Sequence, residues 1–199
     1  MYPKKLIMSD SGAFDLIKDH LLSQNERSIS YDNSCTYRGY SEEYDEEAGD
    51  ETYNRIYDGK ACAVGCLISD DIYDDRHAEL EENTVDDPYV TKAIMDTHPD
   101  WRIRRTSVIL LKNLQYIHDK VDPALWKYIF TDAGVDVKYT ALYDIEYHNT
   151  KRVKDIPWAA KLIEMGIASE MDELSHSFLV LTLNPLHGIP EYAGVNENA

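Results

Sequence analysis

Residues 103–130, IRRTSVILLKNLQYIHDKVDPALWKYIF, decide the fold of this 199-residue chain. Apolar side chains recur there every three or four residues, the spacing that lines one side of an α-helix to about Lys120. They are Ile103, Leu110, Leu114, Ile117 and Val121, with Ser107 completing the spacing. Asp122-Pro123 is typical of an N-cap followed by proline in the first turn. A second helix, with Trp126, Ile129 and Phe130 facing inward, is expected to end at Gly134, which predicts a helical hairpin.

Further helix signals flank this hairpin. Asp10 or Ser11 is expected to cap a helix through about Gln24, and Pro88 to open a short one over residues 89–97. Asp155 and a capping box at Ser169 predict helices through Met165 and Leu183. The small apolar residues 61–68 favour a short buried helix over a strand, and residues 137–147 suit a strand, a hairpin or a helix.

These signals predict a mainly α, compact single domain over residues 1–183, with an acidic loop at 40–58 and room for a small β-hairpin. Residues 184–199 are expected to form an irregular tail. No stretch approaches the roughly 20 apolar residues of a membrane span, and the first residues lack the apolar core of a secretory signal. We therefore expect a cytoplasmic protein without membrane contact, whose three cysteines are reduced.

The formal net charge of −17 is concentrated in one region. Residues 41–100 hold 19 acidic and four basic side chains, a local net charge of −15. Such a field repels phosphate backbones, so direct nucleic-acid binding is disfavoured and a basic or nucleic-acid-binding protein is the expected partner. The alternative is an acidic surface that only keeps the protein in solution.

Tyrosines interleave with these acids, and aromatic side chains are favoured at the centres of protein interfaces. The residues expected to bind a partner are Tyr40, Glu42, Glu43, Tyr44, Asp45, Glu46, Glu47, Asp50, Glu51 and Tyr53. The acidic pairs Asp70-Asp71 and Asp74-Asp75 are expected in a solvated turn rather than at a cation.

A second candidate site is a ligand cluster of Cys35, Arg38, Cys62, His118 and Asp119. In it Arg38 could hold a carboxylate or phosphate. Zinc bound by the three cysteines and His118 is chemically allowed, but buried cysteines usually pack as small apolar residues, so no metal or other cofactor is expected. Adjacent helical residues point about 100° apart, so Asp119 is not expected to orient His118, which instead suits the helix C-terminus. The sequence signatures of P-loop, dinucleotide-binding, zinc-protease and serine-hydrolase sites are missing.

Three segments, SYDNSCTYRG at 30–39, GKACAVGCLISDDIYDD at 59–75 and LLKNLQYIHD at 110–119, followed by Trp126, resemble a group of small proteins of tailed bacteriophages and bacterial genomes. The resemblance covers roughly residues 11–39, 59–80 and 108–130. The matched positions are Cys35, Tyr37, Arg38, Gly39, Cys62, Gly65, Tyr73, Gln115, His118 and Asp119. Relatives often have alanine in place of Cys66, and their counterpart of the acidic segment is shorter.

The resemblance implies a shared fold and a phage or mobile-element origin, but no activity. With the charge, it leads us to expect a non-enzymatic phage-type accessory protein in the host cytoplasm. Such a protein would bind and inhibit a host or viral protein by mimicking nucleic-acid charge. The alternatives are a small enzyme or a ligand- or metal-binding domain built on the Cys/Arg/His cluster, and a structural component of the virion.

Overall fold

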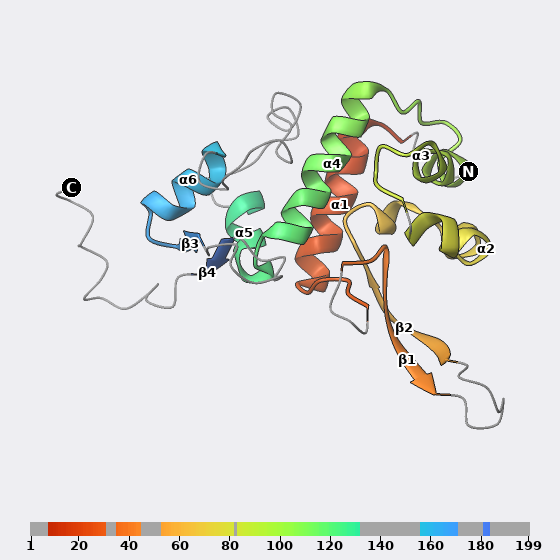
Figure 1. Ribbon diagram of the computed structural model, residues 1–199. Coiled ribbons are helices and arrows are strands. Elements are labelled where there is room, and N and C mark those ends of the chain that lie inside the picture. The colour runs from red at the N-terminus through yellow and green to blue at the C-terminus, as the bar shows by residue number, and fades with distance from the viewer. Residues whose placement is uncertain are drawn as a thin grey trace, which may run out of the picture.

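The computed structural model describes residues 8–30, 35–44, 53–81, 83–131, 156–170 and 181–183, and the fold in these ranges is mainly α. Helices α1 (Asp10–Gln24) and α4 (Arg105–Lys120) lie side by side at the centre (Figure 1). On one side of them are α2 (Asp70–Glu81) and α3 (Pro88–Thr97). On the other are α5 (Pro123–Thr131) and α6 (Pro157–Glu164). No helix within the described ranges is long and apolar enough to cross a membrane.

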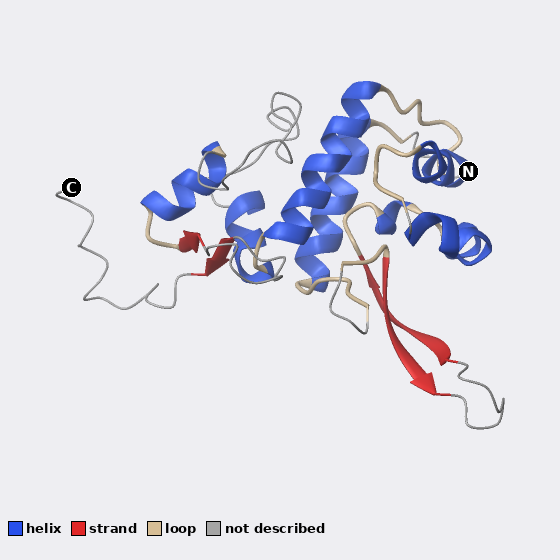
Figure 2. Ribbon diagram, viewed as in Figure 1, coloured by secondary structure: helices blue, strands red, loops and turns tan. Residues whose placement is uncertain are grey.

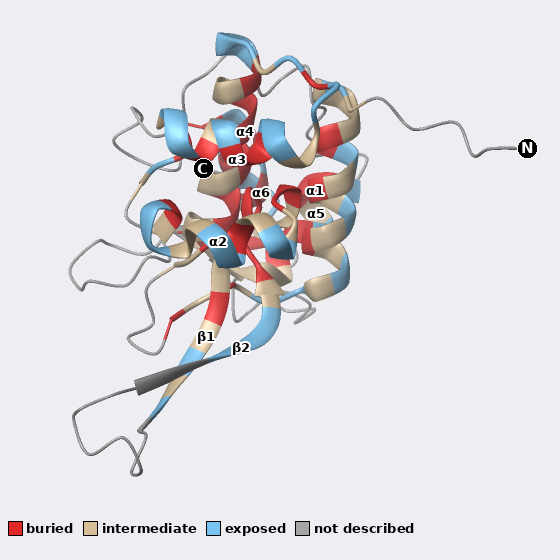
Figure 3. Cartoon of the chain, turned by 90° about the vertical axis from the view of Figure 1, so that its right-hand side faces the viewer, coloured by how far each residue is buried: buried red, intermediate tan, exposed pale blue. Residues whose placement is uncertain are grey.

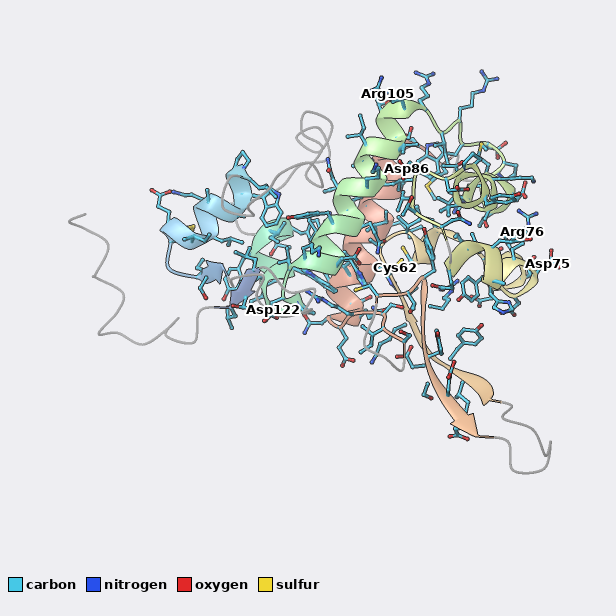
Figure 4. All side chains as sticks on the ribbon, viewed as in Figure 1. Cys62, Asp75, Arg76, Asp86, Arg105 and Asp122 are labelled. Atoms are coloured by element: carbon cyan, nitrogen blue, oxygen red, sulfur yellow. The ribbon has the colours of Figure 1, made fainter. Side chains whose placement is uncertain are left out.

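Helices α1 and α4 run in the same direction. Near their first turns the Asp10 carboxylate accepts hydrogen bonds from the Ser107 hydroxyl at 2.8 Å and from Trp101 Nε1 at 2.9 Å. The cap of α1 is Ser9, whose Oγ accepts the Gly12 amide at 3.1 Å, so the expectation of Asp10 or Ser11 as the cap was wrong. Asp10 is instead used to join the two helices. Arg102, Arg104 and Arg105 are exposed just before and at the start of α4, and Figure 4 labels Arg105 at this end.

The core forms where the apolar faces of α1, α4 and α5 meet, and burial concentrates along these inner faces (Figure 3). Ile17 and Leu21 of α1 and Leu114 of α4 are fully buried, as the spacing of apolar residues predicted. Ser107 is also fully buried because its hydroxyl bonds Asp10. Burial of each large apolar side chain in this seam contributes about 1.5–3 kcal/mol relative to leaving it exposed.

Residues 38–44 and 53–61 form the two antiparallel strands of a hairpin, where the sequence predicted an acidic loop over 40–58. Strand β1 (Arg38–Tyr44) pairs with β2 (Tyr53–Ala61), placing Tyr40 opposite Tyr57 and leaving only 45–52 between the strands. The Tyr40 and Tyr57 rings pack edge to face with centroids 6.4 Å apart. Cross-strand aromatic pairs of this kind stabilise a sheet, and the density of acids conceals their signal in the sequence. The hairpin projects from the helical body (Figure 2).

The chain returns from β2 into a buried turn and then a helix. The predicted short helix at 61–68 is present only as a 3₁₀ helix, η1 (Gly65–Leu67). The acidic sequence that follows, expected to be a turn, forms α2. Asp70 and Asp71 suit its first turn because carboxylates there interact favourably with the helix dipole. Tyr73 and Leu80 of α2 are buried.

The C-terminal part was predicted least well. Strand β3 (Ala168–Glu170) pairs with β4 (Leu181–Leu183), so the expected helix from Ser169 to Leu183 was wrong at both ends. Ser169 lies opposite Thr182, while Leu181 is fully buried and its carbonyl accepts the Asp122 amide at 2.9 Å. Pairing with distant segments thus overrides a local capping signature. Helix α6 begins after Ile156; Gly134, Asp155, residues 137–147 and the tail 184–199 lie outside the described residues.

Candidate functional sites

A partly buried polar network centres on the Asp119 carboxylate at the end of α4. Asp119 Oδ1 lies 2.8 Å from His118 Nδ1 and accepts the Gln115 amide at 2.8 Å. The Cys35 thiol comes from a segment distant in the sequence, and its sulfur lies within 4.8 Å of the ligand atoms of Asp119 and His118. The expectation that Asp119 would not orient His118 was therefore wrong: the direction of Cβ does not decide where atoms two or three bonds further out lie.

The hydrogen bonds of His118 fix its tautomer. The Ser28 amide donates to His118 Nε2 at 3.1 Å in a fully buried setting, so Nε2 carries a lone pair. A neutral imidazole then has its proton on Nδ1, which donates to the Asp119 carboxylate. The ring also stacks on Trp126, with centroids 5.8 Å apart. His118 is consequently held on three sides rather than poised to take a proton from Cys35.

Cys35 is held as a thiol in this arrangement. Burial raises its pKa to about 12, helped by the charge of Asp119 and opposed by that of Arg27. A thiol becomes a nucleophile only as the thiolate, so the network differs from a catalytic Cys–His pair.

Arg38 and Cys62, the other members of the predicted cluster, have partners elsewhere. Arg38 Nη2 donates to the Ile68 carbonyl at 2.6 Å and to Asp70 at 2.9 Å, and the guanidinium lies over the Tyr73 ring. The Cys62 sulfur accepts the Gly65 amide at 3.1 Å.

The structure thus brings together three of the five predicted residues. One ligand atom each from Cys35, His118 and Asp119 lies within 4.8 Å of the others, and in the described ranges this is the group suited to a metal ion. The zinc set of three cysteines and His118 is not assembled: Cys62 and Cys66 are not in the group, and the Cys66 thiol donates to the Ala63 carbonyl.

Sequence reasoning missed two residues beside this network, Arg27 and Ser28. Arg27 Nη2 donates to the Val121 carbonyl at 2.8 Å, while Arg27 Nε and Ser28 Oγ are buried without a hydrogen-bond partner among the described residues. The polar loop around them gives no periodic signal, and only the fold brings it against α4. Asp119 and Gln115 also line a cleft of about 200 Å³ between α4 and residues 84–86, with Lys112 and Lys120 beside them.

A second surface combines acids with exposed apolar groups. Ile56 and Tyr57 of β2 are 44% and 41% exposed, among the largest exposed apolar groups of the described chain. Nearby acids on the hairpin and on the outer side of α2 are also exposed (Figure 4). We call these residues together the acidic arm: Glu43, Ile56, Tyr57, Asp58, Asp71, Asp74, Asp75 and Glu79. Of the residues predicted to bind a partner, Tyr40, Glu42 and Glu43 lie on β1 and the strand ends Tyr44 and Tyr53 oppose each other. Asp45, Glu46, Glu47, Asp50 and Glu51 lie outside the described residues.

Three tyrosines attach the hairpin to the helical body. Tyr57 packs edge to face on Tyr40 and on Tyr73, whose ring centroid is 5.8 Å away. The Tyr73 hydroxyl donates to Glu81 at 2.6 Å, and Glu81 also accepts the Tyr37 amide at 3.1 Å. Because β1, β2 and α2 share these contacts, the base of the hairpin has a fixed position relative to α2.

Comparisons with protein-family models, with curated proteins and with solved structures find no match to this chain.

Proposed function

We propose that this chain is an acidic, non-enzymatic accessory protein that binds a basic, nucleic-acid-binding protein through the acidic arm. The observation that carries the proposal is the charge spacing on α2. Asp71, Asp75 and Glu79 follow one another at intervals of four residues on its exposed side. The helix dipole accounts for Asp71 in the first turn. Asp75 is repelled by both neighbours at this spacing, which costs helix stability, so local stability does not explain Asp75 and Glu79. Departures from local rules of this kind are expected at functional surfaces.

The acids of α2 are available to a partner. In the described ranges, Asp70 pairs with Arg38, and Asp96 pairs with Arg76 and Lys92. Asp74, Asp75 and Glu79 make no ion pair with the residues that the structure describes. A basic surface docking here gains attraction to these carboxylates and relieves their mutual repulsion. The local net charge of −15 over residues 41–100 supports the same partner and opposes a nucleic acid.

The arm also supplies apolar contact area in a fixed geometry. Exposed Tyr57 and Ile56 supply the aromatic and aliphatic contacts that interface centres favour. The Tyr40–Tyr57–Tyr73 packing holds the base of the hairpin in place before binding, so little ordering entropy is lost there. A negatively charged arm that occupies a nucleic-acid-binding surface blocks that surface by mimicry. On the phage origin that the resemblance implies, the encounter takes place in bacterial cytoplasm.

The test compares two triple variants that remove the same number of negative charges. Asp74→Asn, Asp75→Asn and Glu79→Gln neutralise the arm, whereas Asp15→Asn, Asp19→Asn and Glu164→Gln neutralise exposed acids of α1 and α6. Proteins captured from a bacterial lysate with the unchanged chain are purified, and their association is measured by surface plasmon resonance at several salt concentrations. We expect the arm variant to associate about tenfold more slowly at low salt, and the control variant to resemble the unchanged chain.

The purified partner must also lose its bound nucleic acid when this protein is added. A partner that binds both triple variants equally well, or that keeps its nucleic acid at saturating concentrations of this protein, would refute the proposal.

A further inference from the structure

The group formed by Cys35, His118 and Asp119 offers a thiol, an imidazole and a carboxylate within 4.8 Å. These three donors come from two segments more than 80 residues apart, so the fold itself assembles them. Soft sulfur and borderline nitrogen ligands select zinc and its neighbours among divalent metals, whereas Mg²⁺ and Ca²⁺ prefer oxygen ligands alone. We propose that Cys35, His118 and Asp119 bind one Zn²⁺ ion.

The spacing of the donors suits a metal of this size. Ligand atoms around tetrahedral zinc lie roughly 3.5 Å apart, given metal–ligand distances of about 2.0–2.3 Å. In the protein, His118 Nδ1 and Asp119 Oδ1 are 2.8 Å apart, which is shorter than this spacing. No two ligand atoms of the three residues are more than 4.8 Å apart. Rearrangement of about 1 Å by the side chains is sufficient. Three protein ligands leave a fourth position for water or another ligand.

Zinc binding requires Cys35 to release its thiol proton to solvent and His118 to change its tautomer. The Nδ1 atom that faces Asp119 now carries the proton, because the Ser28 amide donates to Nε2. When Nδ1 binds zinc, the proton moves to Nε2 and the Ser28 amide loses its acceptor. An unpaired buried amide weakens binding by about one to two powers of ten. Structural zinc sites have dissociation constants of roughly 10⁻⁷ to 10⁻¹² M. The lost amide acceptor and the raised pKa of the Cys35 thiol both weaken binding, so we expect this site at or beyond the weak end of that range.

Two buried polar atoms next to the group support a site that is incomplete without a ligand. Ser28 is fully buried, and its hydroxyl has no hydrogen-bond partner among the residues described. Arg27 Nε, one residue earlier, is also buried without a hydrogen-bond partner among the residues described. Buried polar groups in native proteins are almost always paired, and these two atoms lie beside the proposed ligands.

The test uses Co²⁺ as a spectroscopic probe and zinc as its competitor. The full chain, reduced and stripped of metal with a chelator, is titrated with Co²⁺. We expect one equivalent to bind, with the near-ultraviolet charge-transfer band of a cobalt–thiolate bond, and Zn²⁺ to displace it. Cys35→Ser should abolish the band and weaken zinc binding by more than about 100-fold, exceeding the loss expected for a residue outside the ligand set. The matched control, Cys66→Ser, removes a thiol outside the group and should keep the band.

A second readout follows the tautomer and does not depend on a variant folding. On adding Zn²⁺ to the unchanged chain, the His118 ring nitrogens should exchange their ¹⁵N chemical shifts, and the Ser28 amide proton should move upfield as it loses its acceptor. Absence of a thiolate band, a band that persists in Cys35→Ser, or zinc binding that leaves the His118 tautomer unchanged would each overturn the proposal.

Discussion

Neutralising Asp75 should stabilise this protein, because the acidic spacing of α2 opposes folding. Asp75 lies four residues from both Asp71 and Glu79, and all three are exposed. Each like-charge pair at this spacing costs about 0.2–0.5 kcal/mol, so Asp75→Asn should raise the free energy of unfolding by roughly 0.4–1.0 kcal/mol. For a chain of this length the corresponding rise in melting temperature is about 1–4 °C. Asparagine resembles aspartate in helix propensity, so the charge is the main change.

The assay is thermal unfolding followed by circular dichroism, at about 10 mM and about 1 M salt. Screening at the higher concentration acts over roughly 3 Å and should remove most of the gain. Asp15→Asn on α1 is the control, because Asp15 is paired with Lys18 at 3.4 Å and its loss should leave the melting temperature unchanged or slightly lower. A variant Asp75→Asn that melts lower than the unchanged chain at low salt, or gains equally at both salt concentrations, would show that repulsion on α2 is not the cause.

Other substitutions and conditions test the contacts that position the sites. Gly65→Ala should lower the free energy of unfolding in urea by about 3 kcal/mol or more, since its Cβ would lie 2.1 Å from the Tyr37 carbonyl oxygen; an equally stable variant would show that this approach relaxes freely. Tyr73→Phe removes the hydroxyl bonded to Glu81 at 2.6 Å and should cost about 1.5–3 kcal/mol by the same measurement. Burial raises the pKa of the Cys66 thiol from 9.0 to about 12, so iodoacetamide should modify it about 1,000-fold more slowly at pH 8 than in unfolded chains, and equal rates would contradict this burial. Since the unfolded thiol ionises first, the stability contributed by keeping Cys66 neutral should be lost progressively as the pH rises from about 9 to about 12, which urea unfolding at each pH can follow.

The helices were predictable wherever the sequence carries local signals for them. Pro88 opens α3, with Asp87 as its cap, and Pro123 opens α5 after Asp122. The spacing of apolar residues located α4 to within two residues of its start. These signals act within one turn of helix and depend little on the rest of the chain.

The strands were not predictable because their stabilising contacts join distant residues. The hairpin depends on Tyr40 meeting Tyr57, and β4 on the buried position of Leu181 against the end of α4. Cys35 and Asp119 were correctly proposed as cluster members, yet Arg38 was assigned to them although it bonds Asp70. Residue types identify candidate ligands, but only the contacts of Arg27, Ser28 and Cys35 with the end of α4 select among them.

Because α1 and α4 run in the same direction, their helix dipoles add. Their positive N-terminal ends lie together, and the exposed Arg102, Arg104 and Arg105 add full charges just before and at the start of α4. The negatively charged acidic arm lies away from this positively charged end, so opposite charges occupy different parts of the molecule. In the field of a positively charged surface such a molecule experiences a torque before contact. This torque turns the hairpin toward the positively charged surface, so the two proteins collide more often in the orientation that allows binding.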